Sequence, residues 1–401
     1  MACFETRKEI WDKVAKDLLE NGGVATVDLT PSLARRHESN FNIAKYALNH
    51  AHAVTKCLTK EVDEQSKKLD ISFPIIDANA NAAHATGYHA AGSSGSSLSR
   101  YNAFREGFIF SNGNFFDVQF NSTDGMRFGQ EGMPTEETEN STRGTFREAM
   151  EDMFSSMHDE IGDNILKAIS RELGLEDENW FQNVLGPTHH SSQWHIKRFT
   201  PYSGSEIMNT SNNYVKSNIA TSLSKSKINR SGNVSKIELL PVHTDPSLIS
   251  VVLHDAPGKR HGAMGLEHHS LVSSDENKFD NVSSKKEYKW VELESHGHYV
   301  ATIFCGSVIS YITGGHFPSA KHRVVSSSLS SKHTERIAAT LFIRPHLDAA
   351  LAVPPSNKID SPKIKVNPNF KFRNWLLQVS RNYMKAEKRK VDKERCNETK
   401  S

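Results

Sequence analysis

Two histidines and one aspartate have the spacing needed to bind a single metal ion. His243 and Asp245 flank Thr244 at the end of the apolar run 237–242, which predicts a β-strand. Residues two apart in a strand point to the same face, so we expect both side chains to reach one ion. His322 begins a later strand-like run, 322–326, which would return beside the first. Two imidazoles and one carboxylate form the facial ligand set typical of non-haem Fe(II), with open positions for other ligands and O2.

An arginine in the next strand-like run offers a partner for an organic anion. Arg336 begins the run 336–343 and follows His322 along the chain. A buried guanidinium makes two parallel charge-assisted hydrogen bonds to a carboxylate, so we expect Arg336 to bind a carboxylate near the metal. Each feature taken alone is most often structural. Their order and their strand context favour one common site.

Short β-rich runs dominate the half of the chain that carries these residues. Separated by Gly, Pro and Ser turns, they predict an antiparallel barrel or jelly roll, with strands at 194–199, 237–240, 248–253, 290–293, 299–304, 307–312, 322–326 and 336–343. Two polar inserts, 203–235 and 256–289, interrupt these runs, and we expect both to be surface loops. The first insert directly precedes the metal-binding strand and is also placed to serve as a lid.

The rest of the chain predicts helices that would support this β-rich half. The strongest is a long amphipathic helix over 145–173, where apolar residues recur at three- and four-residue steps. The other expected elements are a helix at 9–20, a strand at 24–29, a helix at 34–69, a strand at 71–76, a Gly/Ser-rich loop at 87–99, and a helix at 372–384 before a charged tail.

Composition excludes several classes of protein. The chain has 401 residues, of which 37% are hydrophobic, and a formal net charge of +2, which argues against binding of nucleic acid or anionic membranes through bulk charge. No apolar stretch approaches a membrane span, and the N-terminus is charged where a secretory signal would be apolar. The four cysteines lie far apart with no CxxC pair, so we expect neither disulfides nor a thiolate zinc site. We expect a cytoplasmic monomer that acts on a small molecule.

These motifs make the sequence similar to a known family. It resembles the Fe(II)/2-oxoglutarate-dependent dioxygenases, in the branch related to isopenicillin N synthase. The matching motifs follow the family's order: His243-Thr244-Asp245, Gly265-Leu266-Glu267, Trp290-Val291-Glu292, Ile303-Phe304-Cys305-Gly306-Ser307, His322-Arg323-Val324 and Arg336-Ile337-Ala338. The resemblance covers most of the chain, with close motif matches from about residue 194 to 345.

The resemblance implies an α+β fold with a double-stranded β-helix (jelly-roll) core, flanked by N-terminal helices and a C-terminal helix. Residues 1–185 would form the N-terminal helical region with peripheral strands and the scaffold helix, 186–350 the core with two polar inserts, and 351–401 a linker, helix and charged tail.

The same resemblance implies the roles of the site residues. His243, Asp245 and His322 would bind Fe(II), and Arg336 would bind the distal carboxylate of 2-oxoglutarate. With O2, the reaction would oxidise a C–H bond of a metabolite of specialised metabolism by hydroxylation, desaturation or ring closure, and release succinate and CO2.

The sequence departs from the family pattern where 2-oxoglutarate would bind. Ala338 stands where the family has a serine, and Phe199 stands where it often has a tyrosine, so two hydroxyl contacts are missing. Contacts rearranged through Lys197 or Arg198 would compensate, and Lys197, Arg198 and Phe199 are our candidates for contacts with the cosubstrate or the substrate. Two alternatives remain open: an iron-dependent oxidase of the same fold that does not use 2-oxoglutarate, and a catalytically silent relative that binds a metabolite or a protein.

Overall fold

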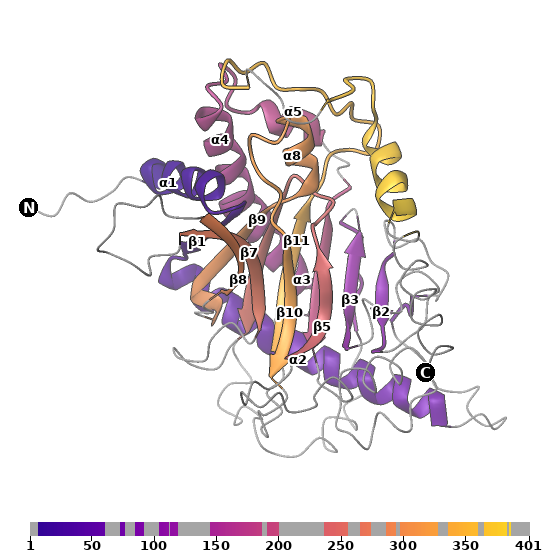
Figure 1. The fold of residues 1–401 in the computed structure, drawn as a ribbon. Helices are drawn as coiled ribbons and strands as arrows, with labels where there is room; N and C mark the ends of the chain where they lie inside the picture. Colours follow the sequence, from indigo (N-terminus) through magenta and orange to yellow (C-terminus); the bar gives the residue numbers. More distant parts are fainter. Residues whose placement is uncertain are drawn as a thin grey trace, which may run out of the picture.

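A computed structural model describes the chain in segments (Figure 1), namely residues 7–60, 73–76, 85–91, 104–111, 113–118, 145–186, 191–199, 236–255, 265–273, 286–293, 297–327, 336–359, 365–382 and 385. The predicted insert 203–235 lies outside these residues, as do parts of the second insert and of the Gly/Ser-rich loop and the tail from 386. Within the described segments, no helix combines the length and apolar character needed to cross a membrane.

Two antiparallel sheets form the centre of the fold. The larger sheet holds, in spatial order, β1 (Val24–Asp28), β9 (Val300–Cys305), β6 (Ile249–Asp255), β11 (Arg336–Ile343), β4 (Gln193–Phe199), β3 (Arg105–Ser111) and β2 (Gly87–His89). The smaller sheet holds β5 (Lys236–His243), β10 (His322–Ser327), β7 (Leu266–Ser273) and β8 (Lys286–Glu292). Strands from the N-terminal part of the chain therefore occupy both edges of the larger sheet.

The two faces of the larger sheet have different partners. On β11, Ile337 and Ala339 belong to the main core, which also contains the buried faces of the helices. Ala338 instead lies in a second apolar cluster with Leu240 and Val324 of the smaller sheet. Because side chains alternate along a strand, every second residue of the larger sheet faces the space between the two sheets.

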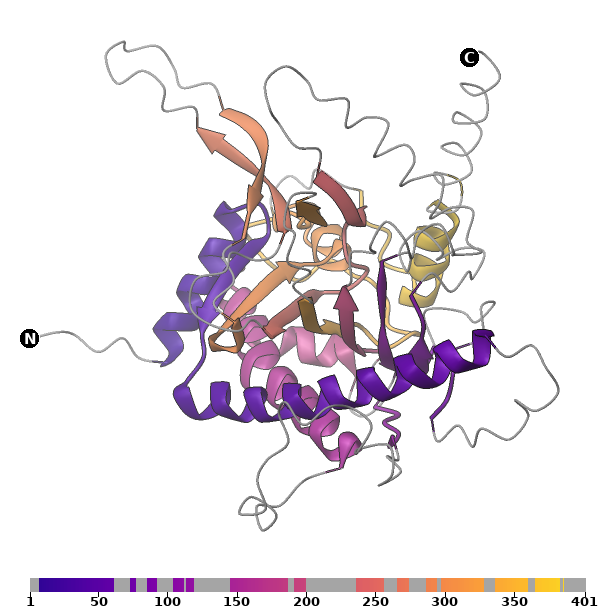
Figure 2. The same ribbon diagram turned by 90° about the horizontal axis from the view of Figure 1, so that it is seen from below.

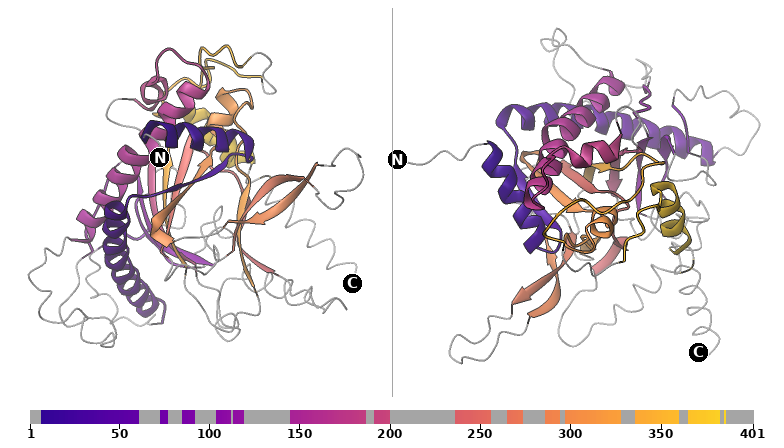
Figure 3. Two further views of the ribbon diagram at one scale, coloured as in Figure 1. Left: turned by 90° about the vertical axis from the view of Figure 1, so that its left-hand side faces the viewer. Right: turned by 90° about the horizontal axis from the view of Figure 1, so that it is seen from above.

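Helices cover the outer face of the larger sheet, as Figures 2 and 3 show. They are α1 (Arg7–Glu20), α2 (Pro31–Lys60), α3 (Phe146–Ser155), η3 (Ser156–Gly162), α4 (Asp163–Glu172) and α5 (Trp180–Leu185). Helix α1 packs on α4, and α2 packs on α3. Gly23 makes the turn from α1 into β1 at φ 87°, where a Cβ atom would lie 2.3 Å from the Pro318 carbonyl oxygen.

The long helix predicted over 145–173 is confirmed in extent, as α3, η3 and α4 in succession. Its start is set by a capping box, in which the Thr145 hydroxyl accepts from the Glu148 N–H and the Glu148 carboxylate accepts from the Thr145 N–H. The middle segment is a π-helix, which the apolar periodicity did not predict. It ends at Gly162, where an added Cβ atom would lie 2.2 Å from Cδ1 of Ile343 on β11. The glycine thus permits close approach of helix and sheet.

One predicted strand is wrong. Residues 307–312 form the helix α8 (Ser307–Ile312), whose buried residues include Val308, Ile309 and Ile312. A short apolar run rich in β-branched residues has no periodicity that separates a strand from a buried helix. Gly306 precedes the helix and keeps its backbone against the loop that follows β5, since a Cβ atom there would lie 2.0 Å from the Ser247 carbonyl oxygen.

Two segments expected to be loops contain strands. The strand β7 and the start of β8 lie inside the predicted insert 256–289, and β2 lies inside the predicted loop 87–99. The sequence pattern did not predict β7 because many of its residues are polar. The strand pairs with β8 in an antiparallel hairpin. Ring contacts such as that of His269 with Tyr288, with centroids 5.1 Å apart, stand there in place of an aliphatic core. Of the predicted strand 71–76, the described part contributes one bridge, Ile75 to Tyr88. Residues 372–382 are helical as predicted.

A buried ion pair connects β3 to β4 on the face that the helices cover. Arg198 and Glu106 are directly opposite in the strand register, and their side chains are 5% and 3% exposed. Arg198 Nε donates to Glu106 Oε1 at 2.7 Å, while Glu106 Oε2 accepts from the Tyr88 hydroxyl at 2.6 Å. Burial raises the pKa of Glu106, but hydrogen bonding to His52 and the charge of Arg198 outweigh it, so the pKa is lowered overall. The carboxylate is therefore buried in its charged form.

Replacing Arg198 by methionine should destabilise the fold. The buried Glu106 carboxylate would lose its cation, which we expect to reduce the free energy of unfolding by about 3 kcal/mol. Adding Glu106→Gln should recover at least about 1 kcal/mol, because the neutral amide still accepts from Tyr88. Urea denaturation of the wild type, the single and the double variant measures both effects. A loss of less than about 1 kcal/mol in the single variant would instead place this pair with weak surface ion pairs.

Candidate metal centre

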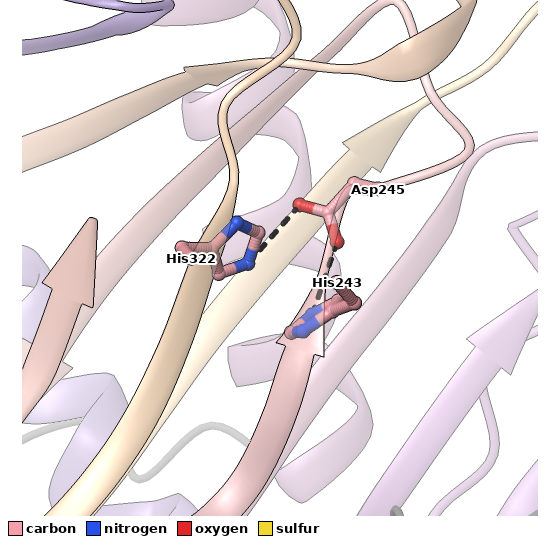
Figure 4. A group of neighbouring side chains, drawn as sticks. All are labelled: His243, Asp245 and His322. Carbon is pink, nitrogen blue, oxygen red and sulfur yellow. Dashed lines mark ion pairs between the residues drawn. The ribbon is translucent and has the colours of Figure 1, made fainter. Parts of the chain in front are cut away.

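The structure brings His243, Asp245 and His322 together in the space between the sheets (Figure 4). Their ligand atoms all lie within 4.8 Å of one another. Asp245 Oδ1 is 3.5 Å from His243 Nε2, and Asp245 Oδ2 is 3.8 Å from His322 Nε2. His243 ends β5 and His322 begins β10, and the two are directly paired in the register of these strands. Asp245 lies just beyond the end of β5, in a loop rather than in the strand itself.

Both imidazoles are held so that Nε2 points to the common centre. His243 Nδ1 lies 2.7 Å from the Pro241 carbonyl oxygen, and His322 Nδ1 lies 3.2 Å from that of Ala320. When each Nδ1–H donates to its carbonyl, Nε2 keeps a free lone pair, as a metal ligand requires. Burial and the neighbouring His322 lower the pKa of His243 to about 3, which favours the neutral ring. Phe304 of β9 stacks on the His322 ring at 4.5 Å.

Backbone contacts hold Asp245 in place. Its carbonyl oxygen accepts from the Ser307 N–H at 2.7 Å and from the Ser307 hydroxyl at 3.1 Å. The residue before α8, Gly306, donates its N–H to the Leu248 carbonyl at 2.8 Å. The segment wrongly predicted as a strand is thus the helix that supports the carboxylate.

Arg336 lies in the same space without an anionic partner among the described residues. It is 4% exposed, its guanidinium lies 4.9 Å from the Phe199 ring centroid, and its Nη2 is 3.3 Å from His254 Nδ1. Neither Nε nor Nη1 of Arg336 has a hydrogen-bond partner in the described part of the chain. Burial lowers the pKa of Arg336 to about 9. A guanidinium with N–H groups that lack a partner is suited to bind a carboxylate.

The three candidates on β4 divide between its two faces. Lys197 and Phe199 face the smaller sheet, and Phe199 belongs to the apolar cluster between the sheets. Arg198 faces the helices, where its guanidinium is bonded to Glu106. The structure therefore brings Lys197 and Phe199, but not Arg198, to the metal-facing side. The Lys197 ammonium is buried, and no described residue hydrogen-bonds to it.

Two further residues beside the site were missed from the sequence. His254 of β6 contacts Arg336, and burial together with that charge lowers its pKa well below the usual value. Arg344 donates to Gln193 Oε1 at 2.5 Å, and its pKa is lowered to about 10 by burial, an effect that the charge of Asp245 opposes. Both signals were available, since Arg344 directly follows β11 at even spacing from Arg336, and His254 lies near the end of the apolar strand that follows Asp245.

Other histidines lie beside the candidate ligands, at the helical face or outside the described residues. His268 lies in the strand β7 and pairs with His322 in the register, so it borders the site. A second group of possible ligands, His158, Asp159 and Asp163, lies on the helical face at the π segment and is partly exposed. Such exposed acidic groups are common without an ion, and no role is assigned to this one. His189 and His190 lie outside the described residues.

Comparison with known proteins rests on structure. No protein-family model matches the sequence, and no curated protein matches it. A full-length Neurospora crassa protein, crystallised in complex with α-ketoglutarate and 5-formyluracil, aligns at 14% identity with a TM-score of 0.53, over 93% of this chain and 90% of that chain.

Two other solved structures align with TM-scores of 0.51 and 14% identity. JOX2 in complex with 2OG, Fe and JA covers 92% of this chain and 81% of that chain. A protein from Caulobacter crescentus, assigned to the 2OG-Fe(II) oxygenase family, covers 92% of both. These alignments show that the chain shares the fold of the three proteins.

Proposed function

We propose that the protein is a non-haem Fe(II), 2-oxoglutarate-dependent dioxygenase. It would oxidise a C–H bond of a small metabolite and release succinate and CO2. The observation that carries the proposal is the group of His243, Asp245 and His322, together with Arg336 in the same space, which has no anionic partner among the described residues. The fold adds support, because the Neurospora crassa protein and JOX2 have it with α-ketoglutarate or 2OG bound.

The residues present fit an iron ion. Two imidazole nitrogens and one carboxylate oxygen are the ligand set of non-haem Fe(II) oxygenases, and they leave positions open for other ligands. The carbonyl contacts of both Nδ1 atoms supply the outer support that such ligands need. His243, Asp245 and His322 would therefore hold the metal.

The residues also fit 2-oxoglutarate. Arg336 would bind the distal carboxylate through N–H groups that no described residue pairs, while His254 contacts the guanidinium at Nη2. Because Ala338 and Phe199 bring no hydroxyl, Arg336 carries this contact without their help. A carboxylate there would neutralise a buried cation that has no counter-charge among the described residues.

With O2, iron and 2-oxoglutarate supply the oxidation, in which 2-oxoglutarate becomes succinate and CO2. The chain's own residues position these groups and exclude water. Phe199 and Phe304 belong to the apolar cluster that faces the smaller sheet, so the space near the ligands is lined partly by aromatic rings. A dry site strengthens the ionic contacts that Arg336 makes.

The finer description of the fold is part of the same proposal. The two facing sheets would form the jelly-roll core of the isopenicillin N synthase-like branch, within 186–350. Residues 1–185 would supply the helical cover with edge strands, and 351–401 the C-terminal linker and helix.

One observation favours a second candidate, an iron-dependent oxidase that does not use 2-oxoglutarate. Ala338 and Phe199 are both buried between the sheets and lack the two hydroxyls that would bind the cosubstrate. Arg336 favours the first candidate, because two of its nitrogens have no hydrogen-bond partner among the described residues. An oxidase that does not use 2-oxoglutarate would leave this buried cation without an anionic ligand.

Iron and 2-oxoglutarate together should give a visible metal-to-ligand charge-transfer band without oxygen. Admitting O2 should bleach the band and produce succinate. Asp245→Ala should abolish the band, because the carboxylate supplies one of three ligands. Asp159→Ala removes a carboxylate from the exposed group and should leave the band unchanged, which makes it the matched control. Iron binding with no response to 2-oxoglutarate would favour the oxidase, and full iron binding by Asp245→Ala would refute the site.

Arg336→Met should weaken 2-oxoglutarate binding while iron binding persists. Loss of a bidentate charge-assisted contact should raise the Kd of 2-oxoglutarate at least about tenfold. Arg336→Lys keeps the positive charge but loses the planar guanidinium, so its Kd for 2-oxoglutarate should fall between those of the wild type and Arg336→Met. Titration of the charge-transfer band without oxygen measures all three values. An unchanged Kd in Arg336→Met would remove Arg336 from the cosubstrate site.

A further inference from the structure

A second buried cation lacks a partner among the described residues, and the proposed reaction does not use it. Lys197 lies in the middle of β4 on the face toward the smaller sheet and is 3% exposed. Its ammonium has no hydrogen-bond partner in the part of the chain that the structure describes. Burial, with a smaller contribution from Arg105, lowers the pKa of Lys197 well below its usual value. Leaving a lysine in such a position costs stability unless a ligand compensates.

The strand register places small residues on both sides of Lys197. Gly107 of β3 and Ala338 of β11 are its direct neighbours, with His89 and His254 next in the same row. Gly107 has φ +146°, and a Cβ atom there would lie 2.1 Å from the Ile196 carbonyl oxygen, so no larger residue fits. Neither direct neighbour therefore brings more than a methyl group to the ammonium.

The surroundings of Lys197 are positively charged. Arg105 lowers the pKa of Lys197 and also that of His195, and its effect extends to His243 at the metal centre. Arg344 lowers the pKa of His195 as well. The carboxylate of Glu106 acts on Lys197 in the opposite sense, but it lies on the other face of the sheet and is paired with Arg198. Positive charges therefore act on the polar side chains around Lys197.

Lys197 and Arg336 are separate positions in the sheet. Lys197 is opposite Ala338, whereas Arg336 is opposite Phe199, two residues further along, and the Phe199 ring lies against the Arg336 guanidinium. The register therefore gives two cationic positions on one sheet face. One carboxylate of 2-oxoglutarate at Arg336 leaves Lys197 without an anion.

We propose that Lys197 forms an anion subsite for the substrate, so that the enzyme oxidises a metabolite carrying a carboxylate or a phosphate. This inference rests on the proposed function for the reaction itself. The anionic group would sit on Lys197 with Arg105 nearby, and the remainder of the substrate would extend toward the metal centre. The charge of Lys197 selects the substrate class, while the metal acts on a C–H bond elsewhere in the molecule.

The test uses the full chain with Fe(II) and 2-oxoglutarate in the absence of oxygen. Sodium acetate and sodium phosphate are the probes, each compared with sodium chloride at equal ionic strength. At least one probe should raise the melting temperature of the wild type by about 2 °C or more relative to chloride, because binding stabilises the folded state. Acetate as the effective probe indicates a carboxylate substrate, and phosphate indicates a phosphate substrate.

Lys197→Met removes the charge and keeps the length of the side chain. In chloride this variant should melt at or above the wild-type temperature, because a buried cation without a counter-charge has been removed. Neither probe should stabilise it. Its Kd for 2-oxoglutarate should change less than about threefold, whereas Arg336→Met should lose 2-oxoglutarate and keep the response to the probe.

Three outcomes would overturn the inference. They are equal probe responses in wild type and Lys197→Met, a lower melting temperature of Lys197→Met in chloride, and a loss of 2-oxoglutarate binding in Lys197→Met as large as in Arg336→Met. Failure of the proposed function would give a different experimental result from failure of the inference about Lys197. The wild type would then give no charge-transfer band with 2-oxoglutarate, while a probe response that depends on Lys197 would still establish the anion subsite.

Discussion

The pairing of β10 with β5 is the constraint on which the site depends. It sets His322 directly opposite His243, so two residues far apart in the sequence meet at one end of the smaller sheet. Asp245 completes the group only because its backbone is bonded to the start of α8. Hydrogen bonds from each Nδ1 to a carbonyl two residues back then orient both rings. The three proposed ligands are therefore positioned mainly by contacts with the backbone.

The basic side chains buried in the space between the sheets are expected to lower the stability of the fold. Arg336 and Lys197 are both buried there without a hydrogen-bonded carboxylate among the described residues, and burial lowers the pKa of each. A fold selected for stability alone would place apolar residues at such positions. On the outer face of the same sheet, Arg198 is paired with Glu106. The contrast between the two faces indicates that the cations between the sheets serve ligands.

The sequence predicted the three side chains that the structure brings together, but not the elements that hold them in place. A strand before His243, a second strand at His322 and a third at Arg336 follow from local pattern, and the long helix follows from its apolar period. The helix α8 could not be separated from a strand, because a short, mostly apolar run carries no decisive period. The strand β7 was hidden by polar residues whose contacts lie across a hairpin. Which face of β4 receives Lys197 and which receives Arg198 depends on pairing with β3, and that is a tertiary property.

The register of β3 and β4 connects the stabilising pair to the proposed substrate cation. Glu106 faces Arg198 across these strands, and the next positions, Gly107 and Lys197, face each other on the opposite side of the sheet. A slip by one residue would exchange the two faces, burying Arg198 beside the metal centre and turning Lys197 toward the helices. Such a slip would also separate Arg198 from Glu106. The buried ion pair on the helical face thus fixes which cation faces the metal.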